Sequence, residues 1–231
     1  MSLAVRATGE ERMDDPALDP AVYAGVLADL GRANRVTLAS RPTLAFLARA
    51  LAGRASVRLL DVGFGDGGML RAVAGWAERR GITARLVGID LNPGSAPVAR
   101  AATPAALPIE YRTGDYADLA DEGWDVVVSS LVAHHMTHDQ LVRFLAWMET
   151  HARLGWMVND LHRHRLAHLG FPLLAAALRW HPIVRHDGRL SIARGFRPAE
   201  WQTLLGEAAI PPGAARVVRR FPFRLCVERT R

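Results

Sequence analysis

The sequence predicts an α/β fold with a mostly parallel seven-stranded sheet, helices on both of its faces, and a C-terminal antiparallel hairpin. Two observations predict it. From residue 56 onward, short apolar runs alternate with helical segments, and this alternation is typical of parallel strands joined by right-handed crossovers. Near the C-terminus, two expected strands, 216–221 and 224–228, are separated by only two residues, a connection that favours an antiparallel hairpin.

The chain before residue 56 predicts helices. Alanine, leucine and valine recur at helical spacing over 16–30 and 42–51, and a proline stands near each start. We expect residues 1–15 to form a loose tail. We expect residues 1–55 to form an N-terminal helical cap on a main domain that covers 56–231.

The parallel strands are expected where apolar runs end in Gly, Asp, Ser or Asn. These strands are 57–62, 85–89, 109–112, 125–129 and 156–159, and the helices around them are 69–80, 95–102, 139–152 and 198–208. The last third of the chain departs from this alternation, because 161–180 predicts one helix that is first rich in Arg and His and then apolar.

Composition excludes several kinds of chemistry. The 231 residues carry 29 basic and 23 acidic side chains, a net charge of +6, and every basic one is arginine. Without lysine, neither a Schiff base nor a lysine general base can form. Cys226 is the only cysteine, which excludes an intrachain disulfide and a cysteine-based metal site. A reducing, cytoplasmic setting is therefore expected.

No secretory or membrane-spanning segment is expected. Residues 1–15 carry scattered charges without an apolar centre. The longest apolar stretch, 166–178, is shorter than the roughly 20 residues that span a bilayer. The arginines are spread along the chain, so we expect no nucleic-acid partner.

Polar residues follow the expected strands, at the sheet edge where open α/β folds bind ligands. Asp61 precedes the turn 63–68, which reads G-F-G-D-G-G and satisfies a dinucleotide fingerprint, and Asp90 lies 22 residues beyond Gly68. An NAD(P)-dependent oxidoreductase is therefore one alternative. The carboxylates of Asp61 and Asp66 would repel a pyrophosphate and attract an ammonium or sulfonium group, which favours a cationic ligand.

Four motifs, in one order along the chain, resemble those of the class I S-adenosylmethionine-dependent methyltransferases. They are Leu59–Gly67, Val87–Leu91, Gly114-Asp115 and Trp124–Ser130. The stretch 129–136 is similar to the small-molecule and quinone-biosynthesis branch of that family. The resemblance implies a Rossmann-like domain, S-adenosylmethionine as methyl donor and S-adenosylhomocysteine as product. Phe64 and Asp66 are bulkier than the residues often found in this turn.

The resemblance also implies a role for each matching residue. Gly63 and Gly65 would let the backbone approach the cofactor, and Asp61 would hold its amino group. Asp90 would accept hydrogen bonds from both ribose hydroxyls. The other implied contacts are Leu91 against adenine, Asp115 as acceptor from its amino group, Tyr116 beside it, and Ser130 and Leu131 along the methionine portion. Asp115 also fits an ordinary turn role, and Tyr116 a core position.

Histidines follow the expected fourth and fifth strands, as His134, His135, His138, His162, His164 and His168. Histidine accepts a proton most readily near neutral pH, so His135 and His162 are the candidate bases on the acceptor side. A structural role for either histidine, and transfer without a base, are alternatives. No metal is expected, because no carboxylate stands among these histidines beyond Asp160.

The acceptor is expected to be a small apolar molecule. Segment 161–195 lies where the family inserts a substrate-covering element, and its part 166–180 offers the apolar face that a lid needs. We expect O-methylation of a phenolic, lipid-like or polyketide acceptor, with C-methylation of a quinone-type ring as an alternative. Residues 129–132 read S-S-L-V, unlike the motif with which nucleic-acid methyltransferases hold a flipped base. A homodimer is left open.

Overall fold

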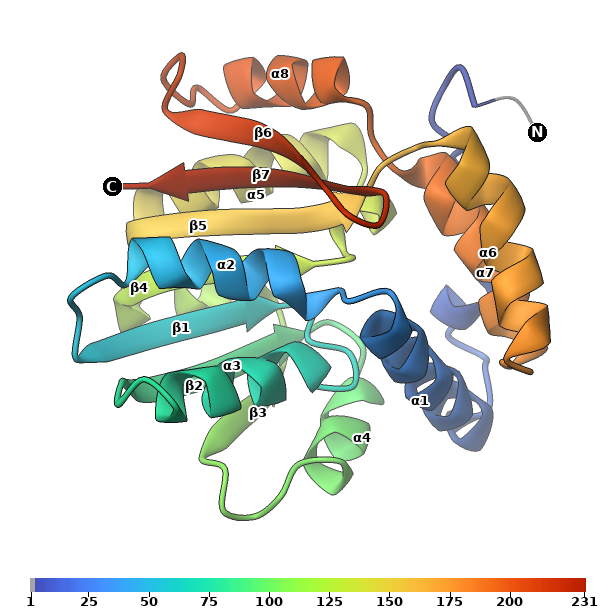
Figure 1. The fold of residues 1–231 in the computed structure, drawn as a ribbon, viewed down its shortest axis with the longest axis horizontal. Helices are drawn as coiled ribbons and strands as arrows, with labels where there is room; N and C mark the ends of the chain where they lie inside the picture. The colour runs from blue at the N-terminus through green and yellow to red at the C-terminus, as the bar shows by residue number, and fades with distance from the viewer. Residues whose placement is uncertain (1–2) are drawn as a thin grey trace.

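The computed structural model describes residues 3–231, and its strands form one seven-stranded sheet in the order β3-β2-β1-β4-β5-β7-β6 (Figure 1). Strands β1 to β5 are parallel, whereas β7 runs antiparallel to both β5 and β6. The predicted fold class is confirmed. The strands are Ser56–Val62 (β1), Thr83–Asp90 (β2), Ile109–Thr113 (β3), Trp124–Ser130 (β4), Ala152–Leu161 (β5), Ala215–Arg220 (β6) and Arg224–Thr230 (β7).

Helices lie on both faces and beyond one edge of this sheet. They are Pro20–Val36 (α1), Ser40–Ala50 (α2), Gly68–Glu78 (α3), Ser95–Ala101 (α4), His138–His151 (α5), Arg165–Ala177 (α6), Pro182–Arg194 (α7) and Pro198–Glu207 (α8). Three short 3-10 helices are Arg12–Asp14 (η1), Tyr116–Glu122 (η2) and Ala133–His135 (η3). Within the described chain, no helix is long and apolar enough to cross a bilayer.

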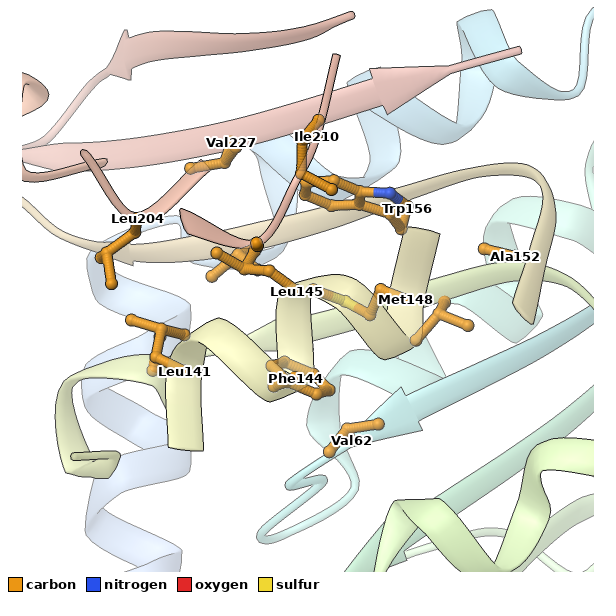
Figure 2. Packing of buried hydrophobic residues seen from close by; sticks show 14 of the residues in the cluster. Val62, Leu141, Phe144, Leu145, Met148, Ala152, Trp156, Leu204, Ile210 and Val227 are labelled. Atoms are coloured by element: carbon orange, nitrogen blue, oxygen red, sulfur yellow. The ribbon is translucent and has the colours of Figure 1, made fainter. Parts of the chain in front are cut away.

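Two apolar layers fix the sheet. On one face, α5 and α8 pack on the strands, and Phe144 and Met148 of α5 lie between Val62 and Trp156 in the same buried cluster (Figure 2). On the other face, the buried cluster includes α2, α3 and α4, with Phe46 of α2 fully buried. The sheet is therefore a rigid platform whose strand ends hold their positions.

A third apolar cluster lies beyond the carboxyl ends of the parallel strands. Val26 and Ala33 of α1 pack there with Ala175 of α6, Trp180 and Val184 of α7. Figure 1 shows these three helices standing apart from the sheet. Helix α1 thus covers the ligand edge, whereas α2, which we expected to belong to the same cap, lies against the sheet.

Two predicted helices differ from the structure. Helix α1 begins four residues later than predicted, because the Asp19 carboxylate accepts hydrogen bonds from the first N–H groups after Pro20. The helix predicted over 161–180 is present as α6 but is shorter, because it covers only Arg165–Ala177. Strand β5 continues to Leu161 because it pairs with β7 as far as Arg224, and His164 then begins α6 as its N-cap.

The prediction of a loose N-terminal tail is also wrong for the described residues. The Glu11 side chain is buried and accepts a hydrogen bond from Ser191 Oγ at 2.8 Å. The backbone N–H of Met13 donates to Asp187 at 3.0 Å. The N-terminal segment is therefore fixed to α7 by polar contacts, which an apolar pattern does not reveal.

Candidate functional site

A cavity of about 660 Å³ opens at the carboxyl ends of the parallel strands. Its walls come from the turn after β1, the ends of β2 and β4, the N-terminal segment, helices α1, α6 and α7, and the β6–β7 turn. This is the edge at which open α/β sheets bind ligands. The cavity joins the predicted cofactor residues to the segment expected to cover the substrate.

The turn after β1 brings backbone close to this cavity. Gly63 has a φ of 77°, and a Cβ atom at this position would lie 2.3 Å from Val132 Cγ2. A side chain therefore cannot replace this glycine without moving its neighbour. Asp66 accepts a hydrogen bond from the Gly68 N–H at 3.0 Å and pairs with Arg71 at 3.1 Å, so Arg71 offsets its charge.

Asp90 ends β2 with its carboxylate on the cavity wall. One oxygen accepts from the Gly65 N–H at 3.0 Å and the other from the Asn92 N–H at 2.9 Å. Burial raises the pKa of Asp90 above its ordinary value, although these bonds oppose the rise. Each oxygen keeps a further lone pair, and two neighbouring acceptors suit a vicinal diol such as a ribose.

Asp61 is 1% exposed, and neither of its carboxylate oxygens has a hydrogen-bond partner among the described residues. Burial, followed by the negative charges of Asp90 and Asp66, raises its pKa to about 7. The neighbouring Val62 and Gly63 line the cavity, whereas Asp61 lies one position behind this wall. A buried carboxylate without partners is costly and would be stabilised by a cationic ligand at the turn.

Together these residues fit an adenosyl amino acid: a glycine turn leaves room for it, Asp90 offers acceptors for a diol, and Asp61 is an unpaired acid near the turn. Leu91 and Tyr116 also line the cavity, and the Tyr116 ring lies 4.8 Å from that of Phe144. These apolar surfaces suit a purine.

The remaining predicted cofactor residues divide into two groups. Ser130 and Leu131 line the cavity after β4, and Leu131 adopts a φ of 63°, a strained conformation that non-glycine residues keep mainly at functional sites. Asp115 is exposed and is not among the residues that line the cavity. Its carboxylate accepts the Ala117 N–H at 2.9 Å and begins η2, which is the turn role left open by the sequence.

His135 lines the cavity and makes a 2.9 Å hydrogen bond between its Nδ1 and Asp14 Oδ2. Burial lowers its pKa, but the bond to Asp14 and the charge of Glu11 outweigh burial, so the pKa ends above its ordinary value. The charge of His135 in turn lowers the pKa of Asp90. The predicted base therefore lies near Asp90 and is held by a carboxylate from the N-terminal segment.

His134 is a buried neighbour of this pair. Its Nδ1 lies 2.7 Å from Asp160 Oδ1, and its backbone N–H donates to Asp160 Oδ2 at 3.0 Å. Its Nε2 lies 3.7 Å from Glu11 Oε1. Interactions with His134 keep the pKa of Asp160 below its ordinary value although burial alone would raise it. This arrangement fixes the loop after β4, on which His135 stands.

The second candidate base, His162, lies elsewhere. It does not line the cavity described above but a neighbouring groove, with basic residues around it. Burial, and then the charge of Arg219, lower its pKa. His135 and His162 therefore line different hollows, since β5 continues beyond its pairing with β4, as far as Leu161, before the chain turns into α6.

Glu11, His134 and His135 are the residues that could hold a metal ion, since their ligand atoms lie within 4.8 Å of one another. Glu11 also accepts a hydrogen bond from Ser191 and lies 3.9 Å from Arg194 Nη1, so protein groups already share its charge. Sequence reasoning missed both Glu11 and Asp14. Neither stands in a recognisable motif, and only tertiary contacts bring them to the strand ends.

The far half of the cavity is apolar. Its wall includes Leu30 and Val36 of α1, Phe171 and Leu174 of α6, and Phe223 of the β6–β7 turn. Gly188 of α7 allows a close approach, because a Cβ atom there would lie 2.0 Å from the Phe171 ring. An apolar molecule placed here would be shielded from water by α6 and α7.

Residues 60–155 match the model of a family described as a methyltransferase domain. The matched range begins in β1 and ends in β5, so it contains the glycine turn, Asp90 and the loop after β4. Over this range the chain is similar to methyltransferase domains, and its seven-stranded sheet has the arrangement of the class I enzymes. Methyltransferases of this class use S-adenosylmethionine as their methyl donor, and the match sets aside the dinucleotide interpretation of the glycine turn.

One curated relative of this chain is a probable fatty acid methyltransferase of Mycobacterium tuberculosis, 29% identical over 143 residues. The alignment covers 60% of this chain and 27% of the relative, so the chain spans about a quarter of the relative's length.

Solved structures of methyltransferases share the fold of this chain. Human N-acetylserotonin methyltransferase with S-adenosylmethionine gives a TM-score of 0.64 at 12% identity, over 92% of this chain and 56% of that one. A plantazolicin methyltransferase with S-adenosylhomocysteine also gives 0.64 at 13% identity, over 94% and 92% of the two chains. Magnesium protoporphyrin IX methyltransferase from Synechocystis gives 0.56 at 15% identity, over 95% and 91%.

Proposed function

We propose that this methyltransferase transfers a methyl group to an oxygen atom of a small acceptor with an apolar body. The observation that carries the proposal is the position of His135. It lies in the same cavity as the glycine turn, Asp90 and the apolar wall of α1 and α6, with Asp14 holding its Nδ1. A base at this place can reach a hydroxyl of a molecule that fills the apolar half.

S-adenosylmethionine, when bound, supplies an electrophilic methyl group. The chain's own residues bind the donor, orient the acceptor, exclude water and receive a proton. Asp14 accepts the Nδ1–H of His135, which leaves Nε2 as a lone-pair acceptor for the proton of the acceptor hydroxyl. Nε2 lies 3.8 Å from Glu11 Oε2, beyond hydrogen-bond distance, so it is free for this role.

Helix α6 is the proposed lid. Its inner residues Ala167, Gly170, Phe171 and Leu174 line the cavity. It shares a small apolar cluster with α1 and α7 and lies outside the two clusters that hold the sheet. Such a segment can move away to admit an acceptor and then return to exclude water.

Two further points agree with an apolar acceptor in a reducing compartment. A fatty acid is the acceptor class in the name of the Mycobacterium relative, and N-acetylserotonin and a porphyrin appear in the names of structural neighbours. Cys226 is free and buried, which suits a cytoplasmic protein. We therefore propose a cytoplasmic enzyme with a lipid-like or phenolic acceptor.

The test has a binding arm and a transfer arm. Calorimetry with S-adenosylhomocysteine should show binding that Asp90→Asn weakens by about 1–3 kcal/mol, through loss of charged hydrogen bonds. The matched control, Asp115→Asn, changes an exposed acid outside the cavity wall. Binding that is unchanged by Asp90→Asn would remove this residue from the ribose role.

In the transfer arm, phenols, hydroxy fatty acids and quinol precursors are incubated with the donor, and the acceptors are analysed by mass and by fragmentation. We expect a methyl gain on oxygen that His135→Ala slows strongly while S-adenosylhomocysteine binding stays nearly unchanged. A methyl group found on carbon, or full activity of the His135→Ala variant, would contradict the proposal.

A further inference from the structure

A second groove, of about 800 Å³, adjoins the main cavity. It lies between the start of α6 and the β6–β7 turn, two segments that Figure 1 shows at the same end of the molecule. Leu166, Phe223 and Arg224 line both hollows, so the two are continuous. The other residues that line the groove are His162, Arg163, His164, Arg165, Arg197, Pro198, Arg219 and Arg220.

This groove is strongly basic. Within the described chain no carboxylate lines it. Arg163 pairs with Glu200 at 2.6 Å and Arg220 with Glu228 at 2.9 Å, outside the lining. Two of the arginines are therefore already neutralised by carboxylates. The remaining positive charge of the groove comes from arginines that form no ion pair among the described residues.

Arg165 and Arg219 supply that remainder. Both are exposed, and neither forms an ion pair within residues 3–231. Arg197 is exposed as well, and its Nη2 donates to the Leu3 carbonyl oxygen, a neutral acceptor, at 2.7 Å. Three guanidinium groups around one groove, without acids among them, would bind a carboxylate or a phosphate.

Arg224 lies where the groove meets the cavity. It is 4% exposed; its Nη2 donates to Thr37 Oγ1 at 2.9 Å, and its buried Nη1 has no partner among the described residues. Asp160 acts on it through space, but His134 already holds that carboxylate. A buried guanidinium without a paired anion is costly, and an anion at this junction would stabilise it.

We infer that the groove binds an anionic carboxylate or phosphate group of the methyl acceptor, and that the apolar body of the acceptor passes between Leu166 and Phe223 into the main cavity. The anionic group is distinct from the oxygen that receives the methyl group, because the groove lies outside the cavity that contains His135. The identity of the ligand as acceptor rests on the proposed function; the anion site itself does not.

The experiment measures binding without turnover, by calorimetry on the full chain saturated with S-adenosylhomocysteine. The probes are decanoate, decyl phosphate, decan-1-ol and inorganic phosphate. The test variant is Arg165→Gln/Arg219→Gln, in which both substituted residues are exposed. Its matched control is Arg54→Gln/Arg79→Gln, which removes the same charge from two exposed positions outside both hollows.

We expect decanoate and decyl phosphate to bind about tenfold or more tightly than decan-1-ol, and the test variant to remove this advantage while the control keeps it. Arg224→Gln should also remove the advantage of the decyl anions over decan-1-ol. The melting temperature of this variant shows whether it folds. If it does not fold, the Arg165→Gln/Arg219→Gln variant decides the outcome.

Equal affinities for decanoate, decyl phosphate and decan-1-ol would overturn the inference but leave the apolar cavity and the proposed function intact. Binding of inorganic phosphate as tight as that of decyl phosphate would overturn it too, because the groove would then serve a free anion. If neither decan-1-ol nor the two decyl anions bind, the apolar acceptor of the proposed function fails together with the inference, and this outcome differs from equal affinities, which overturn the inference alone.

Discussion

Asp61 and Asp90 show how the surroundings of one residue type decide its behaviour. Both acids stand at strand ends, but Asp90 accepts two backbone hydrogen bonds whereas the Asp61 oxygens have no partners among the described residues. The sequence predicted both positions because each follows an apolar run. It could not predict the difference, which depends on burial and on the distance to neighbouring charges.

Asp61→Asn should remove a pH dependence of stability. The folded pKa of Asp61 is raised to about 7, so the folded state binds the proton more tightly than the unfolded state. The wild-type protein should therefore lose stability, on the order of 4 kcal/mol, as the pH rises from the ordinary pKa of Asp to about 7. Urea unfolding at a series of pH values measures this loss. It should disappear in Asp61→Asn and persist in the exposed control, Asp121→Asn.

Asp14→Asn should shift the acidic limb of the rate profile. A histidine base works when it is neutral, so activity should fall as the pH drops through the raised pKa of His135. Removing the Asp14 charge lowers that pKa, and the limb should move to lower pH with a reduced plateau, because the imidazole tautomer is no longer fixed. A profile of kcat against pH that coincides with that of the wild type would exclude His135 as the base.

Among the elements, α5 and α6 differ in what they pack against. The inner face of α5 is fully buried in the main cluster, while α6 leaves Leu169 and Leu173 exposed on its outer face. The apolar spacing of α5 predicted the helix within one residue at each end. The same reasoning placed the start of α6 four residues too early, because the pairing of β5 with β7, which extends the strand to Leu161, joins segments far apart in the sequence.

Phe144→Ala and Leu169→Ala form a matched pair that tests this difference. Phe144 is fully buried between α5 and the sheet, so its truncation should cost about 3–5 kcal/mol of unfolding free energy. Leu169 is 63% exposed, and its truncation should change stability by less than about 0.5 kcal/mol. Denaturant midpoints and slopes give both values; equal losses would contradict the assignment of α6 as a peripheral cover.

For the molecule as a whole, the sequence predicted helices and strands that depend on local patterns. It did not predict contacts between segments that lie far apart in the sequence. The parallel strands and the terminal hairpin followed from apolar runs and short connections. The fixed N-terminal segment and the basic groove could not be predicted in this way. Glu11 bonds to Ser191, and Arg165 lines the same groove as Arg219, only after folding. The cofactor half of the cavity is made by strand ends and was largely predictable, whereas the acceptor half is made by distant segments.

The contact between Glu11 and Ser191 also has a consequence for biosynthesis. The ribosome makes Glu11 180 positions before Ser191. The sheet layers formed by the middle of the chain can begin to assemble earlier. In a nascent chain, the part of the cavity wall that Glu11 and Ser191 share would therefore form only after α7 has been made.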